Sequence, residues 1–295
     1  MVEIREPDGV FAVAEVQGVD PARAGEDAAA LRTALARHAV LCLRLRRALE
    51  DEELQAVARI FGPIKDPVGR TKDGGTLRYS DQRQIIDSGF ILTDEMREQL
   101  GSLSFGGLDD RRPGLFETFH TDDTYTEAPA VATVLHAREL PPSGGGPTCF
   151  LDMRAAYQLL DAATRARVDS LRVVYAYNNE DAFPPRRAAH GPTDALVDVT
   201  HPLVRTHPLA RTRALYLDLD RARHVEGMAI AEGRRLLQSL QDHAEARAPG
   251  CQHRWHDHDV LVWDNASVQH KAGGDFKLGE PRRFWRYMIA GARPA

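Results

Sequence analysis

The sequence predicts a mainly β fold with flanking helices, arranged as a double sheet of the jelly-roll or cupin type. Short apolar runs of strand length recur at fairly even spacing from residue 117 onward, which is typical of a sandwich or barrel core. Strands and helices do not alternate strictly, and this argues against a doubly wound parallel sheet. A jelly roll accommodates many short strands in two sheets, with a few helices outside them.

The N-terminal part of the chain predicts two helices and one strand. Residues Ala28–His38 carry alanine, leucine and arginine at helical spacing, and the apolar run 39–45 predicts a buried strand. Residues 51–61 begin with acidic side chains, which favour a helix N-terminus, and the following Gly62 and Pro63 end the helix.

The rest of the chain predicts a series of strands interrupted by two helices. The helices are expected at 153–171 and 230–246. The strand-like runs are 117–122, 130–139, 148–152, 171–177, 203–207, 214–219, 258–265 and 284–291.

The chain predicts a single domain over residues 1–295. No repeat divides it, and the Gly- and Pro-rich stretch at 141–147 has the length of a turn rather than of a linker. The segment 70–116 is long and irregular apart from a helix-like stretch at 93–101. Because such a segment in a compact domain is commonly functional, we expect a lid insert there.

Composition and charge exclude several classes of protein. The chain has 295 residues, of which 43% are hydrophobic and 27% charged, and its net charge is −5. These are values of an ordinary globular chain, and the acidic balance argues against a nucleic-acid binder. The sequence contains neither an apolar run of about 18 residues, as a membrane span requires, nor the basic start of a secretory signal. Three widely spaced cysteines, Cys42, Cys149 and Cys251, indicate a reducing compartment, so we expect a cytoplasmic protein.

A His-x-Asp motif is the first candidate for chemistry. On a strand, residues i and i+2 share a face, so His120 and Asp122 are expected to project together. An imidazole and a carboxylate form two thirds of a facial triad, which binds iron(II) and leaves positions open for substrate and dioxygen. The pair alone is a weak signal. His270, which follows the apolar strand that ends at Asp264, is the best candidate for the third ligand.

Three arginines follow His270, and they suggest an anion clamp. Arg282, Arg283 and Arg286 lie on or beside the apolar run 284–291, so at least one is expected to point inward. A buried guanidinium is costly unless it meets a carboxylate, which it can hold through two parallel hydrogen bonds. A metal beside such a clamp is what a 2-oxo acid cosubstrate requires.

At this point the sequence resembles a known family. The segments FHTDDTY, LPPSGGGPTCFLDMRAAY, HPLVRTHPLARTRALYLDL, HVEGMAIAEG and VLVWDNASVQH together are similar to the taurine dioxygenase and 2,4-dichlorophenoxyacetate dioxygenase family. The resemblance extends from about Gly18 to Gly291 and is weakest over 70–116. It implies an iron(II)- and 2-oxoglutarate-dependent dioxygenase on a double-stranded β-helix, with dioxygen as the second cosubstrate.

The resemblance also implies roles for individual residues. The iron ligands of the family fall on His120, Asp122 and His270, and a threonine that binds 2-oxoglutarate falls on Thr148. The two C-terminal arginines of the family, four residues apart, fall on Arg282 and Arg286. In that register Arg282 holds the far carboxylate of 2-oxoglutarate, and Arg286 lies beside it, available to the same carboxylate or to an anionic substrate. In an alternative register Arg283 occupies the clamp position, and Tyr287 replaces the second arginine.

The predicted reaction is the oxidation, most simply the hydroxylation, of a substrate C–H bond, with release of succinate and carbon dioxide. The phenoxyacetate-like segments favour a small, anionic organic substrate. The insert at 70–116, with aromatic residues Tyr79, Phe90 and Phe105, leaves open a larger intermediate of natural-product biosynthesis.

Other interpretations remain at the sequence level. Two histidines and a carboxylate also suit a zinc hydrolase, and the fold also suits a cupin-like sensor without catalysis. His256 and His258 form a rival metal motif, although their polar segment predicts a turn. The only partner expected is a small-molecule substrate, and a homo-oligomer is expected only as a habit of the family.

Overall fold

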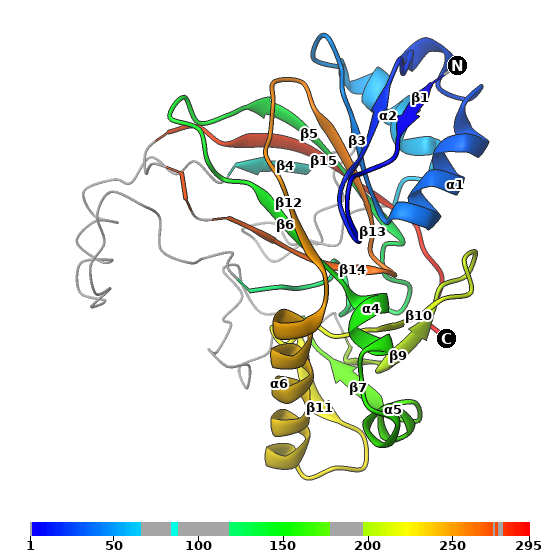
Figure 1. Ribbon diagram of the computed structural model, residues 1–295, viewed down its shortest axis with the longest axis vertical. Helices are drawn as coiled ribbons and strands as arrows, with labels where there is room; N and C mark the ends of the chain where they lie inside the picture. The colour runs from blue at the N-terminus through cyan, green and yellow to red at the C-terminus, as the bar shows by residue number, and fades with distance from the viewer. Residues whose placement is uncertain (1, 66–83, 88–117, 178–196, 274, 277–279) are drawn as a thin grey trace.

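A seven-stranded sheet forms the largest layer of the molecule (Figure 1). The computed structural model describes residues 2–65, 84–87, 118–177, 197–273, 275–276 and 280–295. The strand order is β1-β2-β3-β13-β5-β15-β4, and in it β2 and β3 run parallel while the other neighbours are antiparallel. The strands are β1 (Glu3–Arg5), β2 (Ala14–Gln17), β3 (Val40–Leu43), β13 (Val260–Asp264), β5 (Ala132–Glu139), β15 (Arg283–Ile289) and β4 (Gln84–Asp87).

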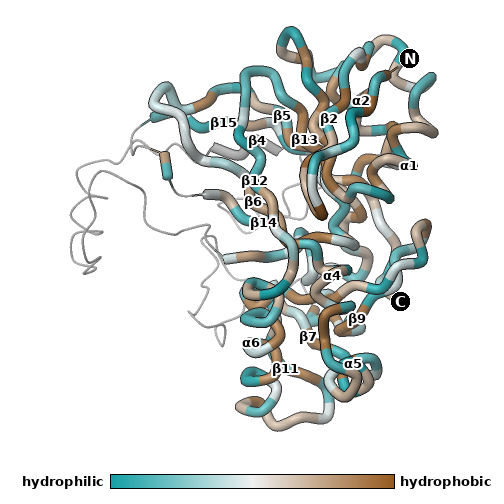
Figure 2. Tube along the Cα trace, in the orientation of Figure 1, coloured by the Kyte–Doolittle hydropathy of each residue, from teal (hydrophilic) through white to brown (hydrophobic). Residues whose placement is uncertain are grey.

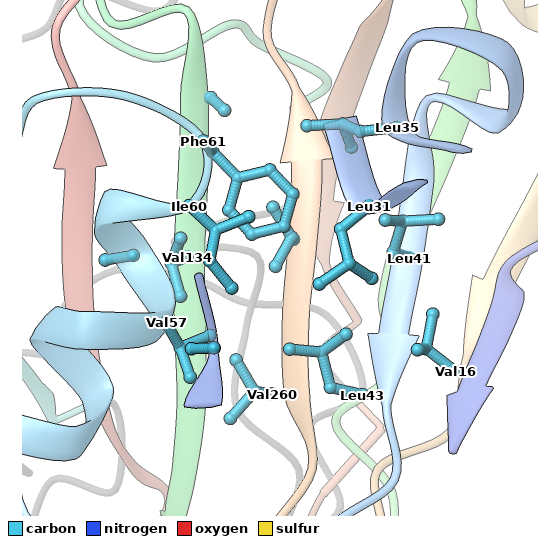
Figure 3. Packing of buried hydrophobic residues seen from close by; sticks show 14 of the residues in the cluster. Val16, Leu31, Leu35, Leu41, Leu43, Val57, Ile60, Phe61, Val134 and Val260 are labelled. Carbon is cyan, nitrogen blue, oxygen red and sulfur yellow. The ribbon is translucent and has the colours of Figure 1, made fainter. Parts of the chain in front are cut away.

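Two N-terminal helices cover one face of this sheet. Helix α1 (Ala28–His38) presents Leu31 and Leu35, and helix α2 (Asp51–Arg59) presents Leu54 and Val57 to strand residues such as Val134 (Figure 3). Helix α2 begins in a capping box, in which Glu50 and Glu53 each accept from the other's backbone N–H. The helices therefore bury an aliphatic layer on the outer side of the sheet.

A three-stranded sheet packs against the opposite face of the large sheet. It consists of β6 (Thr148–Asp152) between β12 (Gly250–His253) and β14 (Val268–Ala272), all antiparallel. Phe150 of β6 lies in one buried cluster with Cys42, Leu261, Trp263 and Phe284 of the large sheet. Successive residues of β3, β13 and β15 therefore point alternately toward the helices and toward the small sheet. Both faces of these strands are buried.

The remaining elements form a second lobe below the sheets in Figure 1. A third buried cluster holds these elements together, and Figure 2 shows apolar segments running through its interior. The elements are α4 (Met153–Gln158), α5 (Ala162–Val168), β7 (Arg172–Tyr175), β8 (Val199–Pro202), β9 (Val204–Thr206), β10 (Arg213–Leu215), β11 (Ala222–Val225) and α6 (Ile230–Arg247).

The helices agree with the sequence except in one place. The helix Ala28–His38 is found with the bounds expected, and those at 51–61 and 230–246 are confirmed within two residues as Asp51–Arg59 and Ile230–Arg247. The single helix expected over 153–171 is wrong, because the chain forms α4 and α5 instead. The carboxylate of Asp161 accepts from the backbone N–H of Thr164 and starts a new helix there.

The strands were predicted less completely. Most of the apolar runs contain strands, but residues 118–122 form only an isolated bridge at His120 before the chain turns. Strands β1, β2, β4, β8, β11, β12 and β14 were not predicted. The proposed lid over 70–116 lies outside the described residues apart from β4, as do its aromatic residues and the helix-like stretch 93–101. None of the described helices is long and apolar enough to cross a membrane.

Candidate metal centre and cosubstrate pocket

His120 and His270 are brought together by the backbone. The N–H of His120 donates to the carbonyl of His270 at 3.1 Å, and the N–H of His270 donates back at 2.9 Å. His270 belongs to β14, so this bridge attaches the segment of His120 to the edge of the small sheet. The two imidazole rings lie 4.3 Å apart between centroids.

Asp122 joins the two histidines because the chain turns immediately after it. Asp123 adopts a left-handed backbone with φ of 63°, and its carbonyl accepts from the N–H of Thr126 in the turn. The carboxylate of Asp122 is buried, and its Oδ2 accepts from the hydroxyl of Thr133 on β5 at 2.6 Å. His120 and Asp122 project together as predicted, although Asp122 stands at the start of a turn and not on an extended strand.

The three side chains offer ligand atoms to a common point. One ligand atom from each of His120, Asp122 and His270 lies within 4.8 Å of those of the other two. Nε2 of His270 is 3.9 Å from Oδ2 of Asp122, which is too long for a hydrogen bond. A metal bound at about 2.0–2.2 Å from each atom would span that distance.

The protonation states suit metal binding. Burial disfavours the charge on Asp122, but the imidazole of His270 in its protonated form, the guanidinium of Arg286 and the hydrogen bond from Thr133 outweigh it and lower the pKa of Asp122 to about 2. Burial, together with His120 and Arg286, lowers the pKa of His270 to about 3 despite Asp122. At neutral pH the site therefore holds an ionised carboxylate and a neutral imidazole at His270.

The surroundings of the two imidazoles also fit a metal centre. Nδ1 of His120 lies 3.0 Å from the carbonyl of Thr118, to which it donates when it carries the ring proton, and this leaves Nε2 as the ligand atom. The ring of His270 packs on Trp263 with 4.7 Å between centroids. Its Nδ1 is buried and has no hydrogen-bond partner among the described residues. Two imidazoles and one carboxylate form the donor set of a facial iron(II) site.

The three C-terminal arginines point to different places. Arg282 is 4% exposed; its Nε and Nη2 donate to the carbonyl of Gly146 at 3.2 and 2.9 Å. Arg283 lies on the outer side, half-exposed, and pairs with Glu139 at 2.8 Å. Arg286 points toward the candidate metal centre, with Nη1 3.4 Å from Oδ1 of Asp122.

The alternation of β15 explains this distribution. Tyr287, which the alternative register offered in place of an arginine, lies in the core below the helices, and its hydroxyl donates to Asp51 at 2.8 Å. Arg286 and Met288 face the inner side and line a cavity, whereas Arg283 and Tyr287 do not. In the described structure only Arg282 and Arg286 of the three arginines therefore face inward.

Thr148 and Gly146 lie together at the start of β6. The hydroxyl of Thr148 accepts from Nε1 of Trp255 at 3.1 Å, and the ring of Trp255 packs on Phe284 at 4.6 Å between centroids. Gly146 has a φ of 64°, and a Cβ there would lie 2.6 Å from Nε of Arg282. The glycine turn therefore provides the space that the Arg282 side chain occupies.

A cavity of about 220 Å³ opens beside His120 and Asp122. Its wall includes three polar residues that sequence reasoning missed, Asp218, Asp220 and Arg221. Burial raises the pKa of Asp218, although the nearby His120 opposes this shift. The polar residues at the end of the apolar run 214–219 were the available signal, since a strand that ends in carboxylates often borders a site.

Two other polar clusters have structural explanations. Asp259 accepts from Arg44 at 2.7 Å and lies 3.0 Å from His253, with Cys42 3.9 Å from the same imidazole. Burial raises the pKa of the Cys42 thiol far above its usual value, so the thiol is protonated and a poor ligand. The rival motif lies in a turn as expected, and His256 there is 69% exposed.

The three cysteines form no disulfide, and a histidine of the HPLVRTHP segment closes a turn. Cys42, Cys149 and Cys251 are all free thiols. Nδ1 of His207 accepts from the backbone N–H groups of Leu209 and Ala210 and thereby closes the turn after β9.

Comparison with known proteins identifies the family. Residues 3–288 match the family model described as "Taurine catabolism dioxygenase TauD, TfdA family". An alpha-ketoglutarate-dependent 2,4-dichlorophenoxyacetate dioxygenase of Cupriavidus pinatubonensis is 30% identical over 237 residues, which cover 79% of this chain and 78% of that protein. An (S)-phenoxypropionate/alpha-ketoglutarate-dioxygenase of Delftia acidovorans is 32% identical over 300 residues, covering 97% and 94%.

A solved structure is similar over the whole chain. The crystal structure of AAD-2 in complex with Mn(II) and N-oxalylglycine has a TM-score of 0.75 and 26% sequence identity, and the match covers 100% of this chain and 99% of that one. The family model, the two relatives and the shared fold agree with one another, and the chain belongs to the TauD/TfdA family of dioxygenases.

Proposed function

We propose that His120, Asp122 and His270 hold the iron(II) of a 2-oxoglutarate-dependent dioxygenase. The observation that carries the proposal is the convergence of their ligand atoms within 4.8 Å of one another, beside a cavity. The low pKa values of Asp122 and His270, about 2 and 3, keep protons from competing with the metal at neutral pH.

We further propose that Arg282 and Thr148 bind the far carboxylate of 2-oxoglutarate. Arg282 is buried, and the ring of Phe284 lies 4.6 Å from its guanidinium carbon. A guanidinium in such an apolar setting favours a carboxylate partner. Trp255 donates to the Thr148 oxygen, so the hydroxyl proton is directed away from the indole and is available to the cosubstrate.

The protein contributes positioning and charge to the reaction. Iron(II) and 2-oxoglutarate supply the activation of dioxygen that oxidises a C–H bond of a small organic substrate, with release of succinate and carbon dioxide. Thr133 orients one oxygen of Asp122, and Arg286 compensates the charge on the other. Arg286 lies where it can also meet an anionic group of the substrate, because it lines the cavity.

We infer that the two packed sheets are the jelly-roll core of this family and that the chain is a single domain over 1–295. The small sheet β12-β6-β14 supplies Thr148 and His270, and the large sheet supplies Thr133 and Arg286. The site thus lies between the two sheets, where a jelly roll holds its ligands.

The first test is anaerobic addition of iron(II) and then 2-oxoglutarate to the purified protein. We expect the weak visible charge-transfer band of the chelate in the wild type and no band in His120→Ala. If iron is bound but no band forms in the wild type, the zinc hydrolase or the sensor becomes the better interpretation. Succinate release with candidate substrates then reports turnover.

A further inference from the structure

A chain of three hydrogen bonds ends on the carboxylate of Asp122. The indole N–H of Trp263 donates to Oδ1 of Asn265 at 2.9 Å, and Nδ2 of Asn265 donates to the hydroxyl oxygen of Thr133 at 2.9 Å. The hydroxyl of Thr133 in turn donates to Oδ2 of Asp122 at 2.6 Å. The three donor residues are at most 2% exposed, so bulk water does not compete for these bonds.

The direction of the chain is set at its start, because an indole can only donate. The side-chain oxygen of Asn265 therefore faces Trp263, and its amide nitrogen, which also can only donate, faces Thr133. A threonine hydroxyl carries one proton. The amide nitrogen of Asn265 cannot accept that proton, whereas the ionised carboxylate of Asp122 can. The hydroxyl proton of Thr133 is therefore directed to Asp122.

The backbone of two neighbouring strands holds Asn265 in place. Asn265 directly follows the last residue of β13, and its own N–H donates to the carbonyl of Val131 at 2.9 Å, just before β5 begins. On β5, Thr133 is the antiparallel partner of Trp263. The side chain of Asn265 thus reaches across this pair of strands and acts on Asp122 through Thr133.

The hydrogen bonds of the chain reinforce one another toward Asp122. A hydroxyl whose oxygen accepts a hydrogen bond becomes a stronger donor, and buried hydrogen bonds in series polarise one another in this way. The distance of 2.6 Å from Thr133 to Asp122 is typical of a hydroxyl that donates to a carboxylate ion. Arg286 lies 3.4 Å from the other oxygen of Asp122. Both oxygens therefore have a neighbour that holds the carboxylate in one orientation beside His120 and His270.

We propose that Asn265 is a positioning residue of the metal centre, which keeps Thr133 as a donor to Asp122 and so orients this carboxylate for the metal. The inference rests on the proposed function, because it takes Asp122 as an iron ligand. Without the amide of Asn265, the hydroxyl of Thr133 is a weaker donor and can rotate away. Loss of a hydrogen-bond partner of a metal ligand typically lowers metal affinity about 10- to 100-fold.

The test is a double-mutant cycle on metal affinity, with Mn(II) as a redox-stable probe for the iron(II) site. Binding of Mn(II) to the metal-free protein is measured by calorimetry without 2-oxoglutarate. Thr133→Val keeps the shape of the side chain and removes the hydroxyl, and Asn265→Leu keeps the shape and removes the amide. Each single variant is expected to raise the Kd for Mn(II) about tenfold.

The double variant separates positioning from a general loss of stability. Because Asn265 acts through Thr133, Asn265→Leu should change the Kd by less than about twofold in the Thr133→Val background. The unfolding free energy of the metal-free protein should behave differently, since Asn265→Leu leaves the indole N–H of Trp263 without its acceptor in either background. Urea unfolding of the four proteins measures this loss and shows that each is folded.

Ser267→Ala is the matched control. Ser267 is also buried, in the turn between β13 and β14, and its hydroxyl donates to Oδ2 of Asp264 at 2.6 Å. Asp264 is outside the candidate triad, so loss of this bond should leave the Kd for Mn(II) unchanged. Asn265→Ala is measured beside Asn265→Leu as a smaller side chain, and Thr133→Val tests the chain independently of both.

Several outcomes would overturn the proposal. These are wild-type affinity for Mn(II) in Asn265→Leu or in Thr133→Val, losses that add fully in the double variant, and an equal loss in Ser267→Ala. Asp122→Ala is titrated in the same series. If the wild type binds no Mn(II), or Asp122→Ala binds it as tightly as the wild type, the proposed function itself fails. If Asp122→Ala loses binding while Asn265→Leu keeps it, only the role of Asn265 is refuted.

Discussion

Arg286 and Asp122 are 164 positions apart in the chain, yet Nη1 of Arg286 lies 3.4 Å from Oδ1 of Asp122. The contact joins β15 to the turn that follows the His120 bridge. It places a permanent positive charge beside a buried carboxylate and contributes to the low pKa of Asp122. The C-terminal strand therefore helps to keep the candidate iron ligand ionised.

Asp122→Ala should remove metal binding without unfolding the protein. The change deletes the only carboxylate of the candidate triad, and two imidazoles alone are a much weaker site for iron(II). We expect less than a tenth of the wild-type iron content after anaerobic loading and desalting. Asp123→Asn is the control, because Asp123 pairs with Lys65 and its left-handed φ of 63° is one that asparagine tolerates. Wild-type iron content in Asp122→Ala would refute the triad.

Arg282→Ala should weaken 2-oxoglutarate binding, whereas Arg283→Ala should not. Arg282 is buried beside Gly146, and Arg283 pairs with Glu139 on the outer side. Loss of a charge-assisted pair is expected to raise the KM for 2-oxoglutarate at least tenfold, equivalent to about 1.4 kcal/mol. Succinate formation at varied 2-oxoglutarate measures it. A raised KM in Arg283→Ala alone would favour the other register.

Trp255→Phe should weaken 2-oxoglutarate binding less than Arg282→Ala does. The variant keeps an aromatic ring against Phe284 but removes the N–H that donates to Thr148 at 3.1 Å. A neutral hydrogen bond contributes about 1 kcal/mol, so we expect a rise of about fivefold in the KM for 2-oxoglutarate. Thr148→Val should produce at least the same rise. The double variant should add little to the effect of Thr148→Val, because both changes act on one hydroxyl, and full additivity would contradict this coupling.

The fold was predictable where local periodicity decides structure. Helix Ala28–His38 has one apolar stripe, and β13 and β15 have continuous or alternating apolar residues, so their burial follows from pattern alone. Short strands such as β8 and β11 depend on pairing with β7, a contact between distant segments that carries little local signal. The break between α4 and α5 was overlooked because Asp161 also fits the polar face of a continuous helix.

The candidate site was predictable as a set of residue types and less so as geometry. Only a few types of side chain bind a metal ion or a carboxylate. The candidate residues could therefore be predicted from the sequence; they are His120, Asp122, His270, Arg282 and Arg286. Asp218 and Asp220 could not be predicted as residues of the cavity wall, since they reach the cavity only through the turn after β10, which brings them beside Thr118 and Thr124. Tertiary packing decides which residues of a turn line a cavity, and the local sequence does not show it.

The pH dependence of stability should contain a contribution from His136. This residue of β5 is fully buried; its Nε2 accepts from the N–H of Leu49 at 3.0 Å, and burial lowers its pKa to about 4. The unfolded chain binds a proton near pH 6.5 and the folded chain does not, so stability is present at higher pH and is lost as the pH falls from about 6.5 to 4.

The loss can be measured with a variant that does not titrate. Linkage gives about 2 kcal/mol less unfolding free energy at pH 5 than at pH 7 from His136 alone, as an order of magnitude. In His136→Gln the side chain retains an acceptor for Leu49 but cannot gain a proton, so its unfolding free energy should fall less over the same interval. Urea unfolding at pH 7 and pH 5 compares the two proteins. Equal losses would show that the imidazole of His136 does not contribute to acid sensitivity, even if the variant is less stable at both pH values.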